Sequence, residues 1–166
     1  NMKNENGVSL PILLVVVVVI AIVATVIGKY GMLMMTETKL QDLRTDMLLI
    51  QAETKKDLEE IRFQTVNLDS NKEEDFEKIK QIRQECLKGT PVQETDILNN
   101  IPTEISIDEN CYYLDESILK DIGVKETDSE KYGYYIVKYD FDNTTTEVMN
   151  TKGYEGQYTL TQLEND

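Results

Sequence analysis

The chain has 166 residues and a formal net charge of −14, with 31 Asp and Glu residues against 17 Lys and Arg residues. This length leaves room for one helix-plus-sheet domain after the N-terminal segment, but not for two. An acidic surface repels phosphate backbones, so direct nucleic-acid binding is not expected. The sequence has no His and no Trp, which removes the commonest general base and the commonest metal ligand.

The N-terminal region consists of a short polar leader, Met2–Gly7, and an uncharged segment that continues to Gly28. The uncharged segment reaches the roughly 20 apolar residues that a bilayer core requires, so the sequence predicts a membrane-spanning helix over residues 8–29. The apolar run is longer than the roughly 7–15 residues of a secretory signal, and no A-x-A cleavage site follows it. We therefore expect the helix to be retained in the mature protein.

The junction Gly7-Val8-Ser9-Leu10, followed directly by the apolar helix, resembles the prepilin signal of type IV pilins and type II secretion pseudopilins. The resemblance implies that a prepilin peptidase cleaves between Gly7 and Val8. It also implies three partners for the apolar helix, namely other pilin or pseudopilin subunits, the peptidase and the membrane. Ile12 stands where the family usually carries Glu, which favours a minor or tip subunit or a divergent lineage. The alternative is an unprocessed signal anchor.

The segment that follows the span, Thr36–Gln64, has the spacing of a helical stripe. Asp57 interrupts the stripe, and the apolar face is wider than a strict coiled-coil seam, which favours packing against a sheet or neighbouring helices. We expect a single helix over Pro11–Gln64, about 80 Å long at ~1.5 Å per residue. The alternative is a parallel homodimeric coiled coil. The stripe consists of Leu40, Leu43, Met47, Ile50, Thr54 and Ile61, with Leu48, Leu49 and Leu58 off the seam.

Residues 66–110 are expected to form a variable connector that contains one short helix. The amphipathic spacing of the apolar residues predicts this helix over Glu74–Leu87, and Gly89-Thr90-Pro91 would end it. The rest of the connector has weak periodicity. Its clearest feature is a short strand expected at Ile105–Ile107.

Residues 111–166 have the pattern of strands around one short helix. Cys111–Leu114 is strand-like, and a helix is expected over Glu116–Ile122 with Asp115 as its N-cap and Gly123 at its end. Alternating β-forming residues then predict an antiparallel meander over residues 134–139, 145–150 and 157–163. This region is similar to the C-terminal ends of pilin-like proteins from low-GC Gram-positive bacteria.

These elements predict an α+β fold. A long N-terminal helix, with a membrane-spanning first half, is expected to pack on a small C-terminal antiparallel sheet in the lollipop arrangement of pilins. The resemblance places the chain in the bacterial cytoplasmic membrane with its N-terminus inside, and then in a cell-surface filament. The expected segments are a leader (1–7), a transmembrane and assembly helix (8–29), an extracytoplasmic helical stem (30–65), the connector (66–110) and the sheet region (111–166).

No pattern in the sequence indicates catalysis. The acidic clusters at residues 69–75 and 140–143 lack the spacing of a calcium-binding EF-hand loop, and no cofactor or metal site is expected. Cys86 and Cys111 are either a disulfide, which would close a loop of about 25 residues and contribute roughly 3 kcal/mol, or two buried free thiols. The chain is therefore predicted to be non-catalytic, and the resemblance to pilins and pseudopilins implies a filament subunit; the alternative is an unprocessed, single-pass, membrane-anchored extracytoplasmic binding protein.

Overall fold

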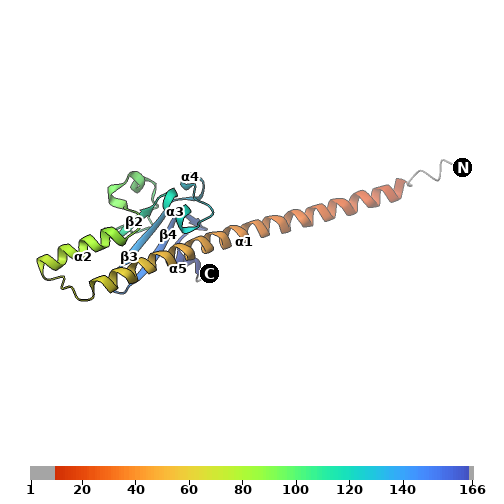
Figure 1. Cartoon of the computed structure of the whole chain (residues 1–166). Helices are drawn as coiled ribbons and strands as arrows, with labels where there is room; N and C mark the ends of the chain where they lie inside the picture. The colour runs from red at the N-terminus through yellow and green to blue at the C-terminus, as the bar shows by residue number, and fades with distance from the viewer. Residues whose placement is uncertain (1–9, 165–166) are drawn as a thin grey trace. The chain divides into compact units, whose positions relative to one another are not determined.

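A computed structural model describes the backbone of residues 10–164 and the side chains of residues 11–21 and 39–164. The chain divides after Gln41 into two compact units, which are described separately below. The longest element, helix α1 (Leu10–Thr65), begins in the first unit and ends in the second (Figure 1). The single helix predicted over Pro11–Gln64 therefore forms, with one further residue at each end.

The prediction that the first half of this helix spans a membrane is wrong. Within the part of the chain that the structure describes, no helix is both long enough and apolar enough to cross a bilayer. The predicted single-pass membrane location and the membrane-spanning first half of the predicted fold are therefore wrong as well.

The second unit contains one antiparallel sheet of five strands in the order β1-β2-β3-β4-β5 (Figure 1). Strand β3 is central, and its register with β4 runs from Tyr135 opposite Asn150 to Asp140 opposite Thr145. The predicted antiparallel meander is present at these two strands and at the start of the third. The strands are β1 (Thr90–Pro91), β2 (Cys111–Leu114), β3 (Tyr135–Asp140), β4 (Thr145–Tyr154) and β5 (Gln157–Thr159).

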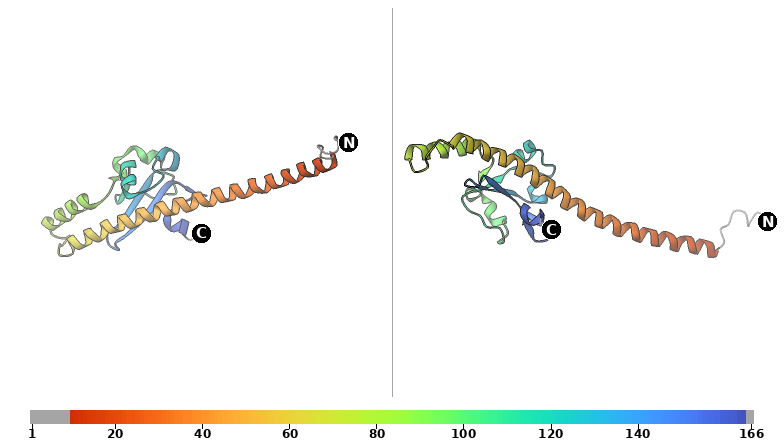
Figure 2. Two further views of the ribbon diagram at one scale, coloured as in Figure 1. Left: turned by 45° about the vertical axis from the view of Figure 1, so that its right-hand side comes forward. Right: turned by 90° about the horizontal axis from the view of Figure 1, so that it is seen from below.

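The second half of α1 packs along one face of this sheet (Figure 2). The buried stripe of the helix consists of Met47, Ile50, Thr54, Leu58 and Ile61, all at most 4% exposed. The Thr54 hydroxyl donates to the Ile50 carbonyl at 2.7 Å and lies 3.3 Å from the Thr146 hydroxyl on β4. Leu58 belongs to this stripe, although its spacing predicts a position off the seam. Asp57 beside it has a side chain that is 17% exposed and pairs with the Lys88 ammonium at 2.7 Å.

The opposite face of the sheet is covered by the connector. Val92, Ile97 and Ile105 form a buried cluster with the sheet residues Cys111, Ile136 and Met149. Alternate residues of a strand point to opposite faces, so β3 is buried on both sides and has an almost continuous apolar sequence. The strand predicted at residues 105–107 is absent; Ile105 donates its backbone N–H to the Pro102 carbonyl in a turn instead.

Several short helices complete the second unit. Two of them confirm predictions: α2 (Glu73–Cys86), and α3 (Glu116–Ile122), where the Asp115 carboxylate accepts from the Ile118 N–H at 2.9 Å. Helix α5 replaces the end of the third predicted strand, because Thr159 and Gln162 form a reciprocal capping box. The other helices are η2 (Val92–Glu94), η3 (Asp96–Asn100), α4 (Ser129–Tyr132) and α5 (Leu160–Glu164).

Candidate functional site

The predicted processing position, Gly7 and Val8, lies outside the described residues. The two cysteines are both described, and both are free thiols. Cys86 is the half-buried last residue of α2, whereas Cys111 is fully buried at the start of β2, where its thiol lies 3.5 Å from an oxygen of Asp108. Burial raises the pKa of both thiols, which disfavours their thiolate forms.

The acidic clusters hold backbone turns. Asp69 accepts from the Asn71 N–H at 2.9 Å and Asp75 accepts from the Asp69 N–H at 3.1 Å, which organises the loop between α1 and α2. Asp140 accepts from both the backbone and the side-chain amide of Asn143, and these hydrogen bonds lower the pKa of its carboxyl group. Among the described residues, no three His, Cys, Asp or Glu side chains gather closely enough to hold a metal ion.

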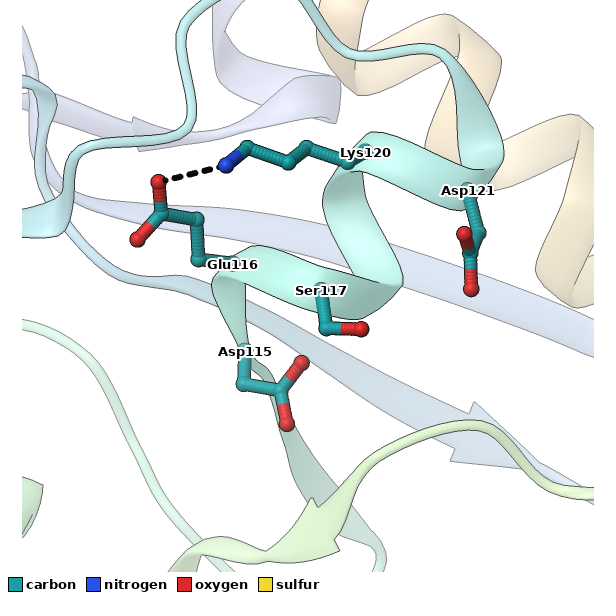
Figure 3. Close-up of a pocket in the computed structure, with 5 residues that line it drawn as sticks. All are labelled: Asp115, Glu116, Ser117, Lys120 and Asp121. Carbon is teal, nitrogen blue, oxygen red and sulfur yellow. Dashed lines mark ion pairs between the residues drawn. The ribbon is translucent and has the colours of Figure 1, made fainter.

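A polar hollow of about 520 Å³ lies at the start of α3 (Figure 3). Three of its five lining side chains have partners within the helix: Asp115 caps the first turn, and the Lys120 ammonium lies 3.1 Å from a Glu116 oxygen. Both members of that ion pair are more than half exposed, so solvent screens the attraction. The hollow has the structure of an ordinary solvated helix end.

The strongest candidate is the exposed apolar segment of α1 in the first unit, Pro11–Ala21. Every residue from Ile12 to Ile20 is Ile, Leu or Val, and each side chain is between 46% and 65% exposed. A shallow hollow of about 500 Å³ on this segment is lined by Pro11, Leu13, Leu14 and Val17. A helix that is apolar on all sides is normally buried against other apolar groups, so this surface is a candidate for assembly.

The helical conformation makes this surface suitable for burial. A helix satisfies its own backbone hydrogen bonds beyond its first turn, so covering the part of the segment from Leu14 to Ala21 leaves no unpaired N–H or C=O groups there. Complete burial of a Val, Leu or Ile side chain contributes about 1.5–3 kcal/mol, and these nine side chains are about half covered already. Covering the rest contributes on the order of 10 kcal/mol before the entropic cost of association.

Comparison with known proteins adds no further assignment. No family model matches the sequence, and neither does any curated protein or any solved structure.

Proposed function

We propose that this chain is a structural subunit of a filament related to type IV pili or type II secretion pseudopili. Its apolar segment, Pro11–Ala21, packs against the corresponding helices of neighbouring subunits. The observation that carries the proposal is the run of nine large apolar side chains, Ile12–Ile20, each about half exposed and without a polar residue among them. The prepilin-like junction directly before this run supports the same assignment.

The charge distribution is consistent with such an assembly. From Thr36 onward the chain carries 15 Lys and Arg residues against 30 Asp and Glu residues, whereas Gly7–Gly28 is uncharged. Like charges oppose close packing of the acidic units, while the uncharged helices have no such barrier. Subunits are therefore expected to meet through their first units, and the acidic second units remain at the periphery.

The prepilin-like junction at Gly7-Val8 also supports a proposal for how the chain is processed and for which kind of subunit it is. A prepilin peptidase would cut between Gly7 and Val8 and leave Val8 at the N-terminus. Ile12 would then be the fifth residue of the mature chain, where the family usually has Glu to neutralise the amine of the next subunit. An uncompensated amine in an apolar core costs several kcal/mol, so the chain is proposed to be a minor or tip subunit.

Cysteine cross-linking of the full-length chain tests the helix contact. Val16→Cys, in a background with Cys86→Ser and Cys111→Val, is expected to give disulfide-linked dimers under oxidising conditions. Lys55→Cys is the matched control, because Lys55 is exposed on the acidic unit. Cross-linking of the control to the same extent, or of neither variant, would contradict assembly through Pro11–Ala21.

Intact-mass measurement of the native protein tests the processing step separately. The mature chain is expected to begin at Val8, and Gly7→Leu is expected to block the cut. A native chain that retains residues before Val8 would remove the prepilin assignment and favour an unprocessed binding protein, whatever the cross-linking result.

A further inference from the structure

A small cavity in the second unit collects two arginine side chains. It lies between the end of α1, helix α2 and the turn that joins β3 to β4, and its volume is about 80 Å³. Arg62 of α1 and Arg83 of α2 both line it, together with Phe141 and Thr144 of the turn. Among the side chains that line this cavity there is no carboxylate, although the chain has 31 acidic residues.

Arg83 is held in place but not neutralised. Its guanidinium lies 3.9 Å from the centroid of the Phe141 ring, so the ring fixes its orientation through a cation–π contact. Its Nε is buried and has no hydrogen-bond partner among the described residues. Burial lowers the pKa of Arg83, and the nearby Tyr112 and Asp142 partly oppose this effect. A buried donor without a partner is uncommon in folded proteins, and it marks a position where an acceptor is missing.

Neither arginine has an ion-pair partner in the described part of the chain. Each ion pair between described residues uses a lysine instead, as in the 2.7 Å pair of Lys88 with Asp57. Asp142 lies close enough to influence the pKa of Arg83, but it does not come within ion-pair distance. The cavity is therefore a local positive site in an acidic protein.

We propose that this cavity binds a carboxylate group, with Arg83 as the principal ligand and Arg62 as the second. The planar guanidinium presents parallel N–H donors that match the two oxygens of a carboxylate. A volume of about 80 Å³ holds roughly two or three waters at ~30 Å³ each, or one carboxylate, and it excludes ligands as large as a nucleotide. The carboxylate is either that of a small free acid or an Asp or Glu side chain of a second copy of this chain.

Acetate is the probe, and it is compared with chloride at equal ionic strength and pH 7 on the full-length protein. If the ligand is a free acid, acetate raises the unfolding temperature in a saturable manner, as mass action requires. Arg83→Gln should abolish this response. The matched control is Arg44→Gln, because Arg44 also has a buried Nε without a partner but donates to the Leu163 carbonyl and lies outside the cavity.

Sedimentation of the same variants tests whether the carboxylate comes instead from an Asp or Glu side chain of a second copy of this chain. If the carboxylate belongs to a second copy, Arg83→Gln lowers the assembled fraction, acetate competes with assembly in the wild type, and Arg44→Gln leaves assembly unchanged. The proposal is refuted if neither stability nor assembly depends on acetate and Arg83, or if Arg44→Gln loses the response equally. The cross-linking of Val16→Cys is independent of this site, so failure here leaves the proposed filament contact standing.

Discussion

Asp46 is a carboxylate buried in the interface between α1 and the sheet, and its neutralisation is expected to stabilise the protein. Its side chain is 4% exposed, and the backbone N–H of Lys125 is its hydrogen-bond donor, at a long 3.5 Å. Burial raises the pKa of Asp46; the hydrogen bond from Lys125 partly opposes this effect, and the negative charges of Glu126 and Asp42 reinforce it. Asp46→Asn keeps an oxygen that can accept from Lys125 and removes the buried charge.

The sign of the effect follows from linkage between proton binding and folding. When folding raises the pKa of a carboxyl group, ionisation of that group destabilises the folded state relative to the unfolded state. The loss is about 1.4 kcal/mol for each tenfold increase in proton affinity on folding. The amide introduces N–H donors that lack assured partners, which offsets part of the gain. We expect Asp46→Asn to raise the free energy of unfolding at pH 7 by about 1 kcal/mol, or roughly 4 °C in Tm for a unit of this size.

Urea unfolding of wild type and variant between pH 7 and pH 4 measures the effect. Because the folded pKa is raised, the contribution of Asp46 to wild-type stability increases as the pH falls through that folded pKa. The advantage of Asp46→Asn is therefore largest at pH 7 and shrinks toward pH 4. Asp121→Asn, an exposed carboxylate on α3, is the control and should change stability by less than about 0.5 kcal/mol. A destabilised Asp46→Asn, or an advantage that grows as the pH falls, would refute the reasoning.

Two further substitutions test the packing of the second unit. Leu58→Ala should lower the free energy of unfolding by about 3 kcal/mol, because Leu58 is 2% exposed and its removal leaves a cavity. Its control, Leu48→Ala, changes an exposed position on the same helix and should lower the free energy of unfolding by less than about 1 kcal/mol. Equal losses in the two variants would contradict the observed buried face of the helix. Gly133→Ala should cost about 2 kcal/mol in denaturant titration, because Gly133 has a φ of +93° and a Cβ there would lie 2.6 Å from the Asn150 side-chain oxygen. A neutral Gly133→Ala variant would show that this loop relaxes freely.

Local sequence signals predicted the elements whose ends are set by their own residues. Asp115 caps α3 and Gly123 ends it in the left-handed conformation, as expected, because both roles depend on neighbouring backbone groups alone. The strands β3 and β4 were also predictable, since alternating β-formers separated by Asp140–Thr144 favour a hairpin. The missed α5 had a local signal as well, namely Thr159 followed three residues later by Gln162.

The sequence by itself determined the α+β class, the 3.6-residue stripe of α1 and the acidic character of the second unit, because these depend on periodicity and composition. Only the tertiary structure decided that Leu58 belongs to the core, that Ile105 packs in a turn, and that Cys86 and Cys111 are free thiols. Arg62 and Arg83 meet at one cavity although they lie on different helices and share no motif. Such contacts depend on how separate elements pack, and the spacing of residues along the chain carries no information about distances between elements.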